Sequence, residues 1–183
     1  NKTVASIVFS DFIRFCPQEN PEFFFNIVEF YKQGIQSNHI SVRLDSICGL
    51  SIIMTPQFID IDSMKIFYDM FLNCLQDHYD NNDIKARIAF ALLQIFQNYY
   101  SIFDVSLFFP DFFQFLGTDV NRIPKYFREN YSQSLIFFVS NFKDIIFPNY
   151  TQKIQFIIKE LLKKHLDPTL IGGLNSAYEI LNQ

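Results

Sequence analysis

Apolar residues recur at helical spacing along almost the whole chain, and the stripes they form repeat at intervals of about 42 residues. Strand-type alternation is not sustained anywhere. Because helical spacing of apolar residues places one face of each helix against a core, the pattern predicts an all-α fold. The clearest stripes are Ile66, Phe67, Met70, Phe71, Cys74 and Leu75; Ile84, Ile88, Leu92, Ile95, Phe96 and Tyr99; Phe127, Tyr131, Leu135, Phe138 and Phe142; and Ile154, Ile157, Ile158, Leu161, Leu162 and Leu166.

Short polar breaks separate the stripes and predict helices joined in antiparallel pairs. The expected pairs are residues 21–36 with 40–54, 63–79 with 83–100, 105–117 with 124–142, and 150–166 with 168–182. A lone helix over residues 4–15 precedes them, and we interpret it as half of a repeat, so that the sequence is a piece of a longer repeat protein. Asp83 and Asp167 are the expected N-caps, while Pro124 and Pro168 suit the first turns of their helices.

The repeat pattern resembles that of armadillo and HEAT proteins. Equivalent stripe positions fall 40, 44, 43 and 39 residues apart, at Val4, Leu44, Ile88, Tyr131 and Leu170. The strings SVRLDSICGL (residues 41–50) and KARIAFALLQ (residues 85–94) are similar to the second helix of those repeats, in which a basic residue precedes an apolar run. This resemblance covers the whole chain. It implies a right-handed α-solenoid of about four helical hairpins plus a leading half-repeat, forming one segment over residues 1–183. The residues alone also fit an ordinary helical bundle.

Composition narrows the classes of partner. The chain is 49% hydrophobic and 19% charged, which is typical of a folded protein. Its net charge of -4 argues against nucleic-acid binding, and the net charge of -5 over residues 1–110 favours a basic protein partner. No apolar run approaches the roughly 20 residues that a bilayer span needs. Cys16, Cys48 and Cys74 lie among apolar residues without paired spacing, which predicts reduced thiols and an intracellular, cytoplasmic or nuclear protein.

Motifs that carry catalysis are missing from the sequence. It contains no glycine-rich phosphate loop, no G-x-S-x-G and no H-E-x-x-H. Cys74 and His78 stand one helical turn apart, but a closed metal site needs four ligands, so we interpret the pair as a buried thiol beside a helix-end histidine. We therefore expect neither an enzyme nor a bound cofactor or metal.

Two charged clusters have simple structural interpretations. Asp77, Asp80 and Asp83 lie in a polar loop that lacks the central Gly and terminal Glu of a calcium-binding EF-hand loop. The dense basic run contains Lys159, Lys163 and Lys164, and it falls in the last turns of a predicted helix, where cations complement the helix dipole.

Residues beside the second-helix stripes are the candidates for partner contacts. In the armadillo arrangement the last helix of each repeat lines a groove that suits an extended peptide. The string FFVSN (residues 137–141) resembles the aromatic-x-x-x-Asn pattern with which importin alpha holds basic peptides. That resemblance implies an amide that clamps the peptide backbone and a ring that flanks a lysine stem. The candidate residues are Gln94, Asn98, Phe137, Asn141, Tyr178 and Asn182.

The sequence therefore predicts a protein-binding scaffold or adaptor, with a nuclear-transport receptor as the nearest family analogy. The alternative is a purely structural helical-repeat segment of a large trafficking or phosphatase-type assembly. In either case neighbouring repeats of the same chain are part of the interaction. Phe90 and Phe137 could also pack between adjacent repeats instead of facing a partner.

Overall fold

The computed structural model describes residues 21–76 and 81–183, and the regular secondary structure of this part of the chain is all helical, with no strand. The prediction of an all-α fold is confirmed. The expected lone helix over residues 4–15, with Val4 and Cys16, lies outside the described residues, as do His78, Asp77 and Asp80.

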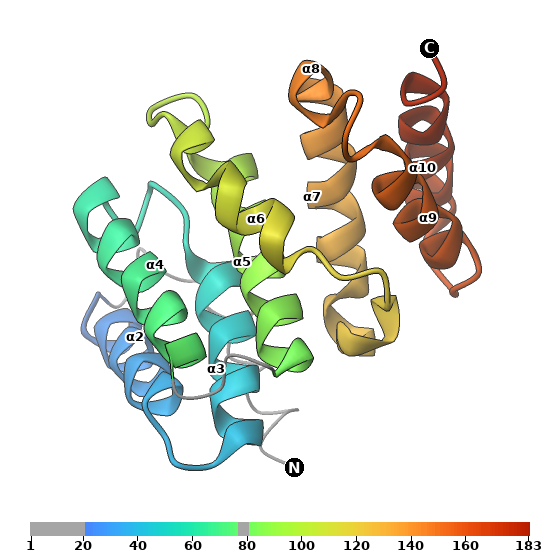
Figure 1. The fold of residues 1–183 in the computed structure, drawn as a ribbon. Coiled ribbons are helices and arrows are strands. Elements are labelled where there is room, and N and C mark those ends of the chain that lie inside the picture. Colours follow the sequence, from blue (N-terminus) through green and yellow to red (C-terminus); the bar gives the residue numbers. More distant parts are fainter. Residues whose placement is uncertain (1–20, 77–80) are drawn as a thin grey trace.

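Four helical hairpins follow one another along the chain (Figure 1). Their helices begin and end close to the predicted positions. Hairpin 1 is α2 (Pro21–Ile35) with α3 (Ile40–Ile53), and hairpin 2 is α4 (Ile61–Gln76) with α5 (Asn82–Tyr99). Hairpin 3 is the 3₁₀ turn η1 (Val105–Phe108) continued by α6 (Phe109–Phe115), with α7 (Arg128–Asn141); between them lie the 3₁₀ turns η2 (Val120–Arg122) and η3 (Lys125–Phe127). A short helix α8 (Lys143–Ile146) leads to hairpin 4, which is α9 (Thr151–Leu162) with α10 (Pro168–Ile180).

Local capping explains where several helices begin. Asp167 caps α10 as predicted, because its carboxylate accepts a hydrogen bond from the Thr169 N–H at 2.8 Å. The prediction for α5 was wrong: Asn81, not Asp83, is the N-cap, and its Oδ1 accepts from the N–H groups of Asp83 and Ile84. The first turn of α5 already contains Asp83, whose carboxylate instead pairs with an arginine of the next hairpin.

Pro124 stands before its helix and not within it. It precedes the turn η3, and α7 itself begins only at Arg128. The short helix α8 was not predicted, because its four residues are too few to form an apolar stripe.

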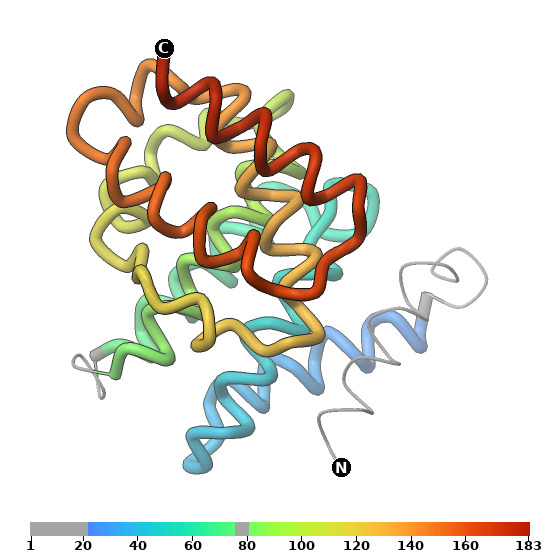
Figure 2. The backbone as a smooth tube through the Cα atoms, turned by 90° about the vertical axis from the view of Figure 1, so that its right-hand side faces the viewer, coloured from blue at the N-terminus to red at the C-terminus, as the bar shows by residue number. Residues whose placement is uncertain are grey.

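The helices form two layers in which the hairpins keep their order along the chain (Figures 1 and 2). The second helices α3, α5, α7 and α10 pack side by side in that order. The first helices form the other layer: α2 contacts α4, Tyr68 of α4 donates a hydrogen bond to Asp111 of α6, and Lys153 of α9 donates to the Phe113 carbonyl of α6 at 3.4 Å. Figure 2 looks along the row from its C-terminal end.

An aromatic cluster joins hairpins 2 and 3. Phe96 of α5 is fully buried, and its ring lies 5.1 to 5.4 Å, centroid to centroid, from the rings of Phe109, Phe112 and Phe138. Each such pair stabilises the fold by about 1 kcal/mol beyond the contribution of the apolar area that it buries. Phe90 is also fully buried, with the rings of Phe127 and Tyr131 beside it, so it packs between hairpins 2 and 3.

Candidate functional site

The candidate partner-binding residues lie on or directly after the second helices, but two of them are engaged inside the protein. Gln94 of α5 is buried, and its Nε2 donates to the Ser134 hydroxyl at 2.5 Å and to the Asn130 carbonyl at 3.4 Å. Asn98 is half-buried and donates to the Met54 carbonyl at 3.0 Å. Both amides therefore join hairpin 2 to its neighbours.

The remaining candidates are more accessible. Asn141 and Asn182 are exposed, and each Nδ2 donates to the carbonyl one helical turn earlier, that of Phe137 or Tyr178 respectively. Phe137 is half-buried, with its ring 4.8 Å from that of Tyr100. The aromatic-x-x-x-Asn arrangement thus occurs twice with the same internal bond. Partner contact by these residues stays a prediction.

Helix α5 offers little surface for a groove. Every residue from Ala86 to Phe96 is buried, which means that the helix is covered around its whole circumference. Arg87 belongs to this run and donates to the backbone carbonyl of Arg122 in the next hairpin. A groove along the second helices would therefore find little accessible surface on α5.

The described cysteines are reduced and buried. Cys48 has no solvent exposure, and this burial raises its pKa from 9.0 to about 12, although Arg87 opposes the shift and Asp45 adds to it. Cys74 donates from Sγ to the Ile35 carbonyl at 3.5 Å, so it joins hairpins 1 and 2. With a pKa of about 12, the Cys48 thiol is protonated at neutral pH and cannot serve as a nucleophile there.

One edge of the molecule carries the described loops that join the two helices of a hairpin, namely those between α2 and α3, α6 and α7, and α9 and α10; we call it the loop edge (Figure 1). Polar contacts run along it from one hairpin to the next. Arg122 pairs with Asp83 at 2.9 Å, and Lys164 donates to the Asn121 Oδ1 at 2.8 Å. Cavities open between successive hairpins along this edge.

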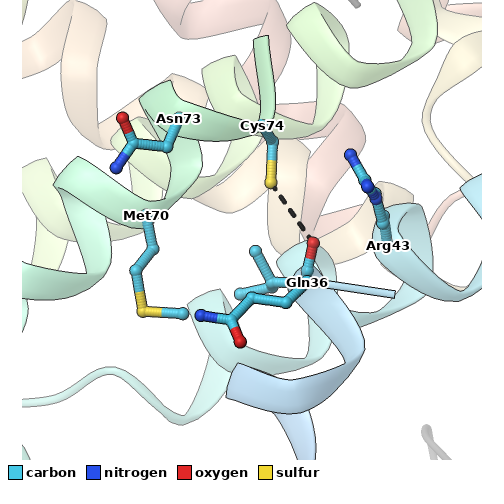
Figure 3. A pocket seen from close by; sticks show the side chains of 6 residues that line it. Gln36, Arg43, Met70, Asn73 and Cys74 are labelled. Atoms are coloured by element: carbon cyan, nitrogen blue, oxygen red, sulfur yellow. Dashed lines mark hydrogen bonds between the residues drawn. The ribbon is translucent and has the colours of Figure 1, made fainter. Parts of the chain in front are cut away.

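The first cavity lies between hairpins 1 and 2 and has a volume of 230 Å³. Figure 3 shows Met70, Asn73 and Cys74 of α4 on one wall, with Gln36 and Arg43 facing them from hairpin 1. The Arg43 guanidinium is held by its Nε, which donates to the Ser37 carbonyl.

The second and third cavities occupy the corresponding places between later hairpins. The second, of 350 Å³, lies between the beginning of α5 and the loop after α6, and it includes Lys85 and Arg122. The third, of 190 Å³, lies between the beginning of α7 and the end of α9. Its walls are rich in cations: Lys125, Arg128, Glu129, Lys163, Lys164, His165 and Leu166.

Each cavity takes one basic residue from the beginning of a second helix. These residues are Arg43, Lys85 and Arg128, which stand 42 and 43 positions apart, and this is the period of the apolar stripes. Sequence reasoning missed Lys125 and Arg128 as site residues, because they lie nearly forty positions before Lys163 and Lys164. Comparing polar as well as apolar residues at the repeat period would have found them.

Neither a metal-ligand cluster nor a membrane-spanning helix occurs among the described residues. No group of three or more His, Cys, Asp or Glu side chains converges there, and no helix is both long and apolar enough to cross a bilayer.

Comparison with known proteins adds no relative. No protein-family model, no curated protein and no solved structure matches the chain.

Proposed function

We propose that the chain is a segment of a right-handed α-solenoid of the armadillo/HEAT type, and that it acts as a protein-binding scaffold or adaptor. A repeat array differs from an ordinary bundle in that each unit contacts only its neighbours. The observation that carries the proposal is the spacing of the contacts between hairpins.

Side-chain hydrogen bonds between neighbouring hairpins join residues 35 to 44 positions apart. The apolar period is about the same, so equivalent positions of adjacent units meet each other. Examples are Cys74 with Ile35, Asn98 with Met54, Tyr99 with Ile59, Gln94 with Ser134, Lys153 with Phe113, and Lys164 with Asn121. A bundle with an accidental sequence period would not be expected to place its contacts at that period.

Removal of one hairpin tests the solenoid. Truncation after residue 150 deletes hairpin 4, and in an array of nearest-neighbour contacts the remaining hairpins stay folded. We expect the truncated chain to keep the helical content of its own residues and a cooperative, less stable unfolding transition in circular dichroism. A truncated chain without cooperative unfolding would identify a single closed core and contradict the solenoid.

The proposed partner is an extended protein segment, and a basic one would be drawn to the chain by the long-range attraction of its acidic first half. The importin-like groove is proposed at α7 and α10, where Phe137, Asn141, Tyr178 and Asn182 lie. A Lys/Arg-rich peptide should bind and should weaken with added salt, and Asn141→Ala together with Asn182→Ala should reduce the affinity. Fluorescence anisotropy at two salt concentrations measures this. The absence of any binding would remove the importin-like receptor.

One observation favours the second candidate, a purely structural repeat segment of a larger assembly. The amides of Gln94 and Asn98 and the whole circumference of α5 are used inside the protein. Such a segment would set shape and spacing, and it would leave both the basic peptide and a matched acidic peptide unbound. The proposed location is intracellular for either candidate, since Cys48 and Cys74 are buried free thiols.

A further inference from the structure

The third cavity of the loop edge brings together cations from two hairpins. Lys125 lies in the turn η3 and Arg128 is the first residue of α7, while Lys163 and Lys164 follow the end of α9, and His165 lines the same space. Glu129 also lines the cavity, and Glu160 forms an ion pair with Lys163 just outside it. These four lysine and arginine side chains are a large share of the 15 in a chain of net charge -4.

Helix stability does not account for this arrangement. The lysines after α9 complement the negative end of the α9 dipole, but Lys125 and Arg128 lie at the positive, N-terminal end of α7, where cations are unfavourable. Phe127 also provides no side-chain cap for that end. Cations that converge from separate hairpins repel one another, and a bound anion would offset that repulsion.

The partners of these side chains leave donors for a ligand. Arg128 uses its Nε to donate to the Ile123 carbonyl at 3.3 Å, which leaves the two terminal nitrogens of the guanidinium. Lys164 donates to Asn121 at 2.8 Å and has further ammonium protons. Lys125 is exposed and forms no ion pair within the described part of the chain.

Size and charge identify the ligand class. A cavity of 190 Å³ is smaller than the roughly 300 Å³ at which sites for drug-sized molecules begin, so it suits one compact group and not a whole nucleotide. An arginine fork beside several ammonium groups matches a phosphate with close to two negative charges. We propose that this cavity binds a phosphate monoester. The proposal depends on the cavity alone and stands or falls separately from the scaffold function.

The test is a titration of O-phospho-L-serine into the full chain at low salt, monitored by the amide shifts in ¹H–¹⁵N NMR spectra. L-serine, which lacks the phosphate and has no net charge, is the comparison. Shifts are expected at residues 121–129 and 163–166 with phosphoserine, not with serine, and they should weaken as salt is added. Inorganic phosphate and a phosphoserine-containing peptide are the two further probes. Tighter binding of the peptide indicates a phosphorylated protein as the source, and equal binding indicates a free small phosphate.

Variants distinguish binding of phosphoserine at this cavity from nonspecific attraction of phosphoserine to any lysine on the surface. Lys125→Gln with Lys163→Gln removes two exposed cations, and Arg128→Gln removes the fork; each should weaken phosphoserine binding roughly tenfold or more. The matched control is Lys32→Gln with Lys65→Gln, which removes two cations that are paired within α2 and α4. The control should bind phosphoserine as the unmodified chain does.

A second readout does not require a ligand. In phosphate-free buffer of low ionic strength, Lys125→Gln should raise the midpoint of thermal unfolding, because it relieves repulsion in the empty cavity. Two results overturn the proposal: phosphoserine shifts that miss both segments of the cavity, or an affinity that the control variant lowers as much as the cavity variants do.

Discussion

Gly49 provides the sharpest test of how closely the two helices of hairpin 1 pack. It is fully buried in α3 where this helix meets α2. A Cβ added there would overlap the ring carbons Cε1 and Cζ of Tyr31 and lie 2.7 Å from its hydroxyl oxygen. Tyr31 is only 1% exposed, so its ring has no free space into which to turn. Gly49→Ala must therefore push α2 and α3 apart.

The change in the free energy of unfolding caused by Gly49→Ala is the sum of two opposing contributions. Alanine gains about 1 kcal/mol over glycine inside a helix. Overpacking a well-filled core costs about 1 to 3 kcal/mol, and overlap with a fixed aromatic ring places this case near the upper end. The expected net loss is about 2 kcal/mol, which lowers the midpoint of thermal unfolding by roughly 4 to 8 °C in a chain of this size.

Gly172→Ala is the matched control. Gly172 lies in α10 with no atom within 4 Å of an added Cβ, so only the helix-propensity term remains. Its midpoint should rise by roughly 2 to 4 °C. Thermal unfolding followed by far-UV circular dichroism measures both variants. Tyr31→Leu in the Gly49→Ala background should recover part of the loss, with a coupling of about 1 kcal/mol or more. Equal stabilisation by both alanines would refute the close approach of α2 and α3.

Three further predictions concern single contacts. Tyr99→Phe removes the hydrogen bond from the buried hydroxyl to the Ile59 carbonyl at 2.8 Å and should cost about 1 kcal/mol in urea unfolding; an unchanged midpoint would deny this link between hairpins. Asn81→Ala should cost about 1 kcal/mol and Asp83→Ala less, because Asn81 is the cap and Asp83 has only a half-exposed ion pair; the reverse order would restore Asp83 as the cap. Stability should fall as pH rises above about 9, because the unfolded chain then loses the Cys48 proton while the native thiol, with a pKa of about 12, retains it; urea midpoints that stay level between neutral pH and pH of about 10 would argue against that burial.

The placement of the helices follows from local information in the sequence. Stripes such as Ile84 to Tyr99 exceed the length of a buried strand, and polar breaks with caps such as Asp167 end them. The same period also indicated that successive hairpins would repeat. These features depend on neighbouring residues along the chain, and for this reason they can be derived without coordinates.

Contacts between hairpins could not be derived in the same way. Asn98 and Asn141 occupy equivalent positions beside their stripes, yet Asn98 is half-buried and donates to the Met54 carbonyl, whereas Asn141 is exposed. The difference arises because α5 has covering helices all round it, whereas α7 has an accessible face. Burial of this kind depends on how far apart two layers sit, and no local pattern encodes that distance.

The sequence by itself determined that this protein is built from helices in antiparallel pairs with a period near 42 residues, because backbone hydrogen bonding and the apolar period act within a helix. Only the tertiary structure decided which polar side chains meet. Lys125 and Lys164 come to one cavity, and Arg122 reaches Asp83, because stacking of hairpins brings positions about forty residues apart to the same edge. The charge of a site depends on which side chains lie close together in space. The basic cavity could therefore be found only from the tertiary structure.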